Sequence, residues 1–197
     1  LFRDELGYEY LYGPDIERSP KEVILKDIFE ERLRFINPDA DDKAIEETLR
    51  KVYKIDHPNP IENNKIFHEY LTSGVSVNYY KDGVKSDHLW LVDFKNTSSN
   101  QFTICNQFTV WDVGKKRPDV IVFVNGLPLV LMELKSGSRE DVGTTEAYLQ
   151  LKNYMKAIPK IFTYNSFSVI SDLVNTKAGT ITAEEDRYMR WKSIDGI

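Results

Sequence analysis

The stretch RPDVIVFVNGLPLVLMELK, residues 117–135, predicts two β-strands joined by a tight turn. Both apolar runs are rich in β-branched residues, and Asn125-Gly126 between them is a strong hairpin signal. Charged side chains nevertheless stand at the ends of the runs: Asp119 precedes the first, and Glu133 and Lys135 close the second. Because an unpaired buried charge is strongly unfavourable, these three residues indicate a functional site.

The register of this hairpin decides whether the two carboxylates meet. A two-residue loop pairs Asp119 with Met132, which places Asp119 on the opposite face of the sheet from Glu133. A three-residue loop that includes Leu127, with a bulge, pairs Asp119 with Glu133 directly. A site built from both carboxylates requires the second register or an equivalent twist at the strand end.

In the second register two carboxylates and an ammonium converge, because Glu133 and Lys135 are two residues apart in a strand. Two hard oxygen ligands suit Mg²⁺, which keeps several waters, and Mn²⁺ can substitute. The metal would polarise a phosphate and activate water, while Lys135 would orient or deprotonate that water or stabilise the developing charge. The set predicts a metal-dependent phosphodiesterase. The alternative is a structural ion pair of Asp119 with Lys135, with Glu133 solvated.

Composition is that of one globular domain, with 197 residues of which 41% are hydrophobic. The net charge of −5 argues against a protein that coats nucleic acid, yet residues 115–160 hold eight Lys/Arg against five Asp/Glu. A single cysteine, Cys105, excludes an internal disulfide and fits a reducing cytoplasm. No apolar run approaches the roughly 20 residues of a membrane helix, so no membrane partner is expected.

The basic turn beside Asp119 is a candidate DNA contact. Lys115, Lys116 and Arg117 could bind backbone phosphates. The alternative is an ordinary solvated turn.

Along the chain, helical patterns come first and strand patterns follow. Ser19 and Pro20 predict a helix start, with that helix stopped at Asn37-Pro38. A helix near the end of the chain would be capped by Thr144 or Thr145. The other predicted helices cover residues 41–55 and 61–74, and the predicted strands cover 75–80, 88–94, 101–111, 120–124, 128–135 and 166–171, with a turn at 82–83.

This order predicts an α/β fold with a mixed central β-sheet flanked by helices. We interpret residues 1–197 as one domain cut from a longer subunit. Residues 1–74 would form a mainly helical part and residues 75–197 a sheet-containing catalytic core.

The stretch RPDVIVFVNGLPLVLMELKSG resembles the nuclease motif in the restriction (R) subunit of type I restriction–modification enzymes, within the PD-(D/E)xK nuclease superfamily. Downstream, YLQLKNYMKAIPKIFTYN carries Gln150 and Tyr154 in the Q-x-x-x-Y arrangement of RecB-like nucleases. The resemblance covers nearly the whole chain, most specifically residues 88–196. It implies a PD-(D/E)xK restriction-endonuclease-like fold and a type I site-specific deoxyribonuclease that cuts double-stranded DNA with Mg²⁺.

The resemblance also implies roles for individual residues. Asp119, Glu133 and Lys135 would be catalytic, and the carbonyl of Leu134 would join the two carboxylates as a metal ligand. Gln150 and Tyr154, one helical turn apart, would reach the scissile phosphate or the adjacent backbone; the alternative is that this helix simply packs on the sheet, with Tyr154 in the core.

One position of the superfamily pattern has no match here. Many members place an acidic residue from the first helix in the site. Here Lys26 stands where that acid is expected, so the position is unassigned.

The implied partners are a specificity subunit and a methyltransferase subunit in a prokaryotic cytoplasm. The full subunit would continue into ATP-dependent translocase domains, but the chain has no G-x-x-x-x-G-K-[ST] motif, so ATP would act only through domains outside it. A second hypothesis is a non-catalytic module that docks DNA or the neighbouring motor. Metal binding separates the two, because a docking module has no use for the carboxylate pair.

Overall fold

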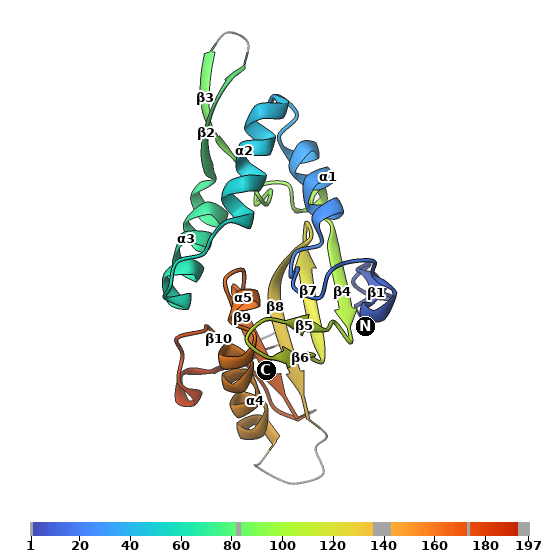
Figure 1. Ribbon diagram of the computed structural model, residues 1–197. Coiled ribbons are helices and arrows are strands. Elements are labelled where there is room, and N and C mark those ends of the chain that lie inside the picture. The colour runs from blue at the N-terminus through green and yellow to red at the C-terminus, as the bar shows by residue number, and fades with distance from the viewer. Residues whose placement is uncertain (1, 82–83, 136–142, 173, 193–197) are drawn as a thin grey trace.

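The computed structural model describes residues 2–81, 84–135, 143–172 and 174–192 (Figure 1). The α-helices are α1 (Lys26–Ile36), α2 (Asp42–Tyr53), α3 (Pro60–Ser73), α4 (Gly143–Ala157) and α5 (Pro159–Phe162). The strands are β1 (Glu9–Tyr12), β2 (Val75–Lys81), β3 (Val84–Leu89), β4 (Phe102–Asn106), β5 (Val110–Trp111), β6 (Lys115–Lys116), β7 (Val120–Val124), β8 (Leu127–Leu134), β9 (Phe167–Ser171), β10 (Thr176–Gly179) and β11 (Met189–Arg190). Short 3₁₀ turns occupy Gly13–Asp15, Thr97–Ser99 and Glu185–Arg187.

A seven-stranded mixed sheet forms the centre, in the order β1-β4-β7-β8-β9-β10-β11. The pairs β1–β4 and β8–β9 are parallel, and the other neighbours are antiparallel. The predicted α/β class with a mixed sheet flanked by helices is confirmed, and it is consistent with a PD-(D/E)xK-like fold. β1 joins this sheet as an edge strand although it lies in the part of the chain predicted to be mainly helical.

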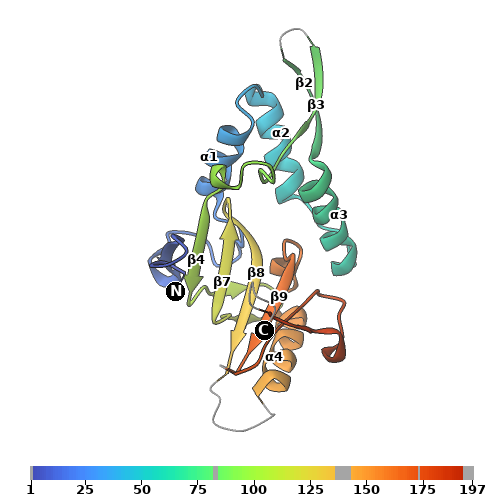
Figure 2. The ribbon, with the colours of Figure 1, turned by 180° about the vertical axis from the view of Figure 1, so that it is seen from behind.

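Two groups of elements surround the sheet. Helices α4 and α5 and the small β5–β6 hairpin lie on one face, as the two opposite views agree (Figures 1 and 2). Helices α1 and α2 and the β2–β3 hairpin gather beyond the β7–β8 turn, and α3 runs back from them toward α5. Within the part of the chain that the structure describes, no helix is long and apolar enough to cross a bilayer.

The β7–β8 hairpin combines a two-residue turn with a bulge. Val124 pairs with Leu127 across the turn, whereas Val122 pairs with Val130, so the strand accommodates an extra residue at Leu129. The loop is therefore the two-residue alternative, and the extra residue lies within the strand rather than in the turn. The register that a three-residue loop would produce is nevertheless present, because Val120 pairs with Met132 and one further step places Asp119 opposite Glu133.

The turn of this hairpin also anchors the helical part of the chain. Asn125 and Gly126 have φ of 52° and 78°, as a type I′ turn requires. The buried Asn125 amide donates to the Leu91 carbonyl and to Asn100 Oδ1. The Gly126 carbonyl accepts from the Leu25 N–H at 2.9 Å.

This last contact explains why α1 starts later than its sequence pattern indicates. A helix start at Ser19 and Pro20 was expected, but α1 begins at Lys26. Val23, Ile24 and Leu25 are buried before the helix begins, and the Leu25 N–H is already bonded to the turn. Tertiary burial therefore overrides the local start signal.

The strand predicted over residues 88–94 is mostly wrong for a similar reason. Only His88 and Leu89 belong to β3. Beyond them the buried Asn37 side chain bonds both backbone groups of Trp90, and Asn100 Oδ1 accepts the Asp93 N–H. Side-chain amides thus replace the ladder of a sheet.

Two other predicted features differ. The strand predicted over 101–111 is interrupted at Gln107, whose φ is 57°, and divides into β4 and β5. Thr144 and Thr145 lie inside α4, so neither is its cap. The turn predicted at 82–83 lies outside the described residues.

Gly126→Ala should strongly destabilise the fold. A Cβ there would lie 2.5 Å from the Leu25 carbonyl oxygen, and the positive φ adds strain. We expect a loss of about 2–5 kcal/mol in the free energy of unfolding, measured by urea denaturation. Gly7→Ala is the matched control, since its φ is +69° but no atom lies within 4 Å of the added Cβ. Equal losses in both variants would contradict the close packing of the turn.

Candidate active site

Asp119 and Glu133 lie at the end of the β7–β8 hairpin opposite its turn. Asp119 immediately precedes β7 and is half-buried. Its Oδ2 accepts a hydrogen bond from the Leu134 N–H at 2.9 Å, which ties the carboxylate to the last residue of β8. The same bond places a peptide group of Leu134, the residue expected to supply a carbonyl ligand, beside the Asp119 carboxylate.

Glu133 is a buried carboxylate with a partner on each oxygen. The residue is only 2% exposed. Oε1 accepts from Lys135 Nζ at 2.7 Å, and Oε2 accepts from the Tyr154 hydroxyl at 3.1 Å. The structure therefore brings Asp119, Glu133, Lys135 and Tyr154 together. Glu133 is buried, so the alternative in which it is solvated is wrong.

Helix α4 supplies the third side of this cluster. Tyr154 is 3% exposed, so its ring packs in the core while its hydroxyl reaches Glu133 and lies 3.5 Å from the Arg117 carbonyl oxygen. Gln150, one turn earlier, hydrogen-bonds with the Tyr154 hydroxyl. The packing described as the alternative for Tyr154 is therefore present, and its hydroxyl in addition contacts Glu133.

Opposing effects act on the pKa of Glu133. Burial, the largest effect, raises the pKa of Glu133, and the charge of Asp119 raises it further. Hydrogen bonds from Lys135 and Tyr154 act in the opposite direction without reversing the shift. A second positive charge beside Asp119 and Glu133 would relieve this unfavourable pairing.

Lys135 is held as a cation. Burial lowers the pKa of its ammonium, but the hydrogen bond to Glu133 and the charges of Glu133, Asp119 and Glu146 outweigh burial and raise it. Glu146 was not predicted as a neighbour of the site. Its signal in the sequence is spacing, because residues 146, 150 and 154 follow one another at four-residue intervals along one helix face.

The three basic residues predicted to touch DNA lie on and after β6. Lys115 pairs with Trp111 of β5, and its Nζ lies 5.1 Å from the centre of the exposed Trp111 ring. Arg117 is exposed and precedes Pro118 and Asp119. This basic segment therefore leads directly into the carboxylate site.

The acidic side chains of the first helix lie elsewhere. Helix α1 packs at the turn end of the hairpin, where Leu25 and Phe29 meet Gly126, whereas Asp119 and Glu133 lie at the other end. Glu22 pairs with Lys26. In the ranges that the structure describes, no group of three or more His, Cys, Asp or Glu side chains could hold a metal ion, so Asp119 and Glu133 would have to suffice with backbone and water.

The raised pKa of Glu133 makes a prediction about stability. A raised folded-state pKa contributes stability that is complete below the unfolded value of 4.5 and is lost as pH rises through the folded value. Glu133→Gln removes the titrating carboxyl and with it this pH-dependent loss of stability. The free energy of unfolding of the variant, relative to that of the parent, should therefore increase as pH rises from below 4.5 to neutrality. The expected increase is about 1.4 kcal/mol for each unit by which folding raises the pKa of Glu133.

Urea denaturation of both proteins across that pH range provides the measurement. Carboxyl groups that do not interact with Glu133 cancel in the difference. A variant that loses stability relative to the parent as pH rises would show that ionised Glu133 is stabilised by its partners.

The chain is similar to known proteins of one family. The family model described as type I restriction enzyme R protein N terminus matches residues 1–187. A Haemophilus influenzae protein, named type I restriction enzyme HindI endonuclease subunit, is 33% identical over 96% of the chain and 19% of its own length. A Staphylococcus aureus protein, named type I restriction enzyme SauCOLORF180P endonuclease subunit, is 37% identical over 49% of the chain and 10% of its own length. The chain thus spans about a fifth of the first of these relatives.

Proposed function

This chain belongs to the family of type I restriction enzyme R protein N termini, and on that premise we propose that it is a metal-dependent endonuclease domain that hydrolyses phosphodiester bonds of double-stranded DNA. One observation carries the proposal. Asp119 and the buried Glu133 converge at one end of a hairpin, with Lys135 and Tyr154 bonded to Glu133. A buried carboxylate whose pKa is raised by burial and by a second carboxylate marks a functional site more readily than a structural ion pair.

The donor set suits Mg²⁺ or Mn²⁺. Both ions take oxygen ligands, and Mg²⁺ needs only one or two protein carboxylates because it keeps several waters. Asp119 and Glu133 would hold the ion, joined by the Leu134 carbonyl. When bound, the ion would polarise the scissile phosphate and lower the pKa of a coordinated water.

Lys135 would act as a fixed positive charge rather than as a base. The raised pKa of its ammonium keeps it protonated at neutral pH. Its Nζ lies 2.7 Å from Glu133 Oε1, so it would be close to a phosphate oxygen bound to an ion that Glu133 ligates. A charge pre-oriented at that position stabilises the transition state without reorganisation.

Tyr154 and Gln150 would position Glu133. The hydroxyl of Tyr154 donates to Glu133 Oε2, and Gln150 hydrogen-bonds with that hydroxyl. Partners of this kind fix the orientation of a carboxylate that ligates a metal. Gln150 could in addition reach the DNA backbone.

At the level of the whole enzyme, we propose that the chain works with specificity and methyltransferase subunits in a prokaryotic cytoplasm. ATP would act through translocase domains of the same subunit. Lys115, Lys116 and Arg117 would bind DNA phosphates next to the cut. If the metal site fails the test that follows, a docking module for DNA or the motor is the remaining candidate.

Metal binding is the first test. An ion that binds only the folded chain stabilises it by about 2.7 kcal/mol at a hundredfold excess over Kd. For a chain of this size, Mn²⁺ should therefore raise the melting temperature by about 5–10 °C. Asp119→Asn and Glu133→Gln should abolish most of the rise, while Glu46→Gln, on the exposed face of α2, should not.

Differential scanning calorimetry with and without Mn²⁺ measures these shifts. Both substitutions keep the shape of the side chain, and the amide oxygen introduced by Asp119→Asn can still accept the Leu134 N–H. Equal shifts in the parent and in both site variants would place the ion elsewhere and favour the docking module.

Tyr154→Phe is the second test. It removes the bond to Glu133 and keeps the ring in the core, so we expect a loss of about 1 kcal/mol in stability. If Tyr154 orients a metal ligand, the cleavage rate of the assembled enzyme should fall about 10–100-fold. Tyr148→Phe is the control, because this buried α4 tyrosine bonds Glu184 at 2.7 Å, outside the site. Equal rate losses in the two variants would contradict a positioning role.

A further inference from the structure

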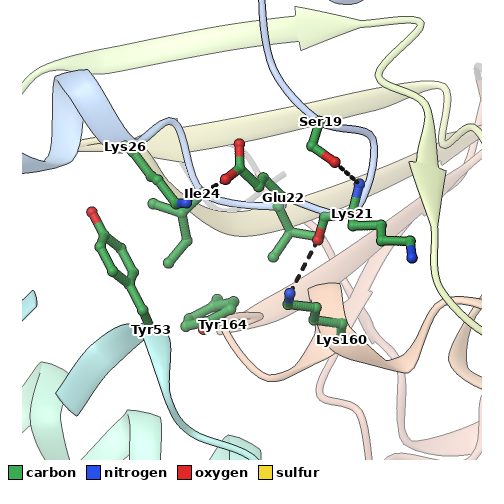
Figure 3. Close-up of a pocket in the computed structure, with 9 residues that line it drawn as sticks. Ser19, Lys21, Glu22, Ile24, Lys26, Tyr53, Lys160 and Tyr164 are labelled. Atoms are coloured by element: carbon green, nitrogen blue, oxygen red, sulfur yellow. Dashed lines mark hydrogen bonds and ion pairs between the residues drawn. The ribbon is translucent and has the colours of Figure 1, made fainter. Parts of the chain in front are cut away.

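A second cluster of basic side chains surrounds a cavity away from the carboxylates. This cavity of about 280 Å³ lies between the segment before α1, the end of α2 and α5 (Figure 3). Lys21, Lys26 and Lys160 line it against a single carboxylate, Glu22, so its lining is positive in a chain of net charge −5. Its volume is near the lower end of the roughly 300–1,000 Å³ that small-molecule ligands occupy, which suits a phosphodiester group better than a whole nucleotide.

The three lysines of the cavity differ in their partners. Lys26 is paired with Glu22, whereas Lys160 Nζ donates to the Lys21 carbonyl at 3.1 Å rather than to a carboxylate. Figure 3 shows the Lys26 amine directed at the Glu22 carboxylate and the Lys160 amine directed at the Lys21 carbonyl, while the Lys21 amine extends away from both. The Ser19 hydroxyl oxygen accepts from the Lys21 N–H at 3.4 Å, which leaves the hydroxyl proton to donate.

Backbone contacts join this cavity to the β5–β6 hairpin. The Trp111 N–H donates to the Pro20 carbonyl at 2.9 Å, next to Lys21. The Lys160 N–H donates to Asp112 Oδ2 at 2.8 Å. Both cavity lysines are thus fixed against β5 and the turn that follows it.

The same hairpin leads to the candidate active site. Strand β6, which pairs with β5, carries Lys115 and Lys116 and continues through Arg117 to Asp119. The four steps along the chain from Lys115 to Asp119 can span at most about 14 Å. Successive phosphates of one DNA strand are spaced about 3.4 Å along the helix axis, so one backbone can follow this line over a few nucleotides.

We propose that the cavity lined by Lys21, Lys26 and Lys160 is a phosphate-binding subsite for the DNA backbone, beyond the basic segment that leads to the carboxylates. The inference rests on the proposed function, because it takes DNA as the ligand. The β5–β6 hairpin, with its exposed Trp111, lies between the subsite and the carboxylates and supports the intervening strand. Phosphate contacts of this kind set the position of the duplex without reading its sequence.

Salt-dependent DNA binding tests the subsite. The probe is a short fluorescent duplex, and its affinity for the chain is measured by anisotropy over a salt series with EDTA, so the metal site plays no part. Each phosphate contact contributes about 0.9 to the slope of log K against log salt. Both lysines line the same one-phosphate cavity, so Lys21→Gln with Lys160→Gln should lower the slope by about 0.9 and weaken binding.

The matched control is Lys43→Gln with Lys65→Gln, which removes the same charge from exposed positions on α2 and α3. It should leave the slope unchanged. Circular dichroism melting curves establish that both double variants fold. Equal changes of slope in the two double variants, or none in either, would overturn the subsite while leaving the proposed nuclease function in place.

Two further outcomes identify other failures. A parent chain that binds no duplex would overturn the subsite and the DNA substrate of the proposed function together. ATP supplies the alternative source of phosphate. A rise in melting temperature with ATP that the Lys21/Lys160 variant abolishes, without any change in its DNA slope, would assign the cavity to a nucleotide instead.

Discussion

The bulge at Leu129 is the constraint on which the candidate site depends. Side chains alternate between the two faces of a strand, so one extra residue moves every later side chain to the other face relative to its partner strand. With Val122 opposite Val130, Glu133 reaches the side of Asp119; without the extra residue, Met132 would take that place. The turn cannot supply the extra residue instead, because Val124 already pairs with Leu127 across a two-residue turn.

The two ends of the hairpin differ in how favourable their burial is. At the turn, Asn125 and Gly126 are buried against the helical part through hydrogen bonds to Leu91, Asn100 and Leu25. At the open end, Glu133 is buried with a charge that its surroundings disfavour. A strongly packed turn can hold the strands in register despite that unfavourable charge, which is how proteins retain strained functional groups.

Helix α4 connects the carboxylates with the basic side of the molecule. Its Tyr154 contacts both Glu133 and the Arg117 carbonyl, and one turn later the Ala157 carbonyl accepts the Gly114 N–H. The β5–β6 hairpin is therefore held along the C-terminal half of α4. Because positioning by rigid elements limits the freedom of side chains, a ligand bound along this hairpin would meet the carboxylates in a fixed orientation.

The residue types of the site could be identified from the sequence alone. Asp119, Glu133 and Lys135 stand out because charges rarely end buried strands, whereas Gln150 and Tyr154 were singled out by the resemblance to the Q-x-x-x-Y arrangement of RecB-like nucleases. The mixed α/β class also followed from the order of the periodic segments. These features are local, so neighbouring residues in the chain are sufficient to show them.

Tertiary structure alone decided how those residues meet. Whether the extra residue lies in the turn or at Leu129 depends on how the hairpin packs, and periodicity cannot distinguish the two. The late start of α1 depends on the distant Gly126 carbonyl, and the end of β3 on the Asn37 amide. Likewise, the sequence marked Glu133 as charged, but only the fold supplied Tyr154 and Lys135 as its partners, because hydrogen bonds between distant segments have no local signature.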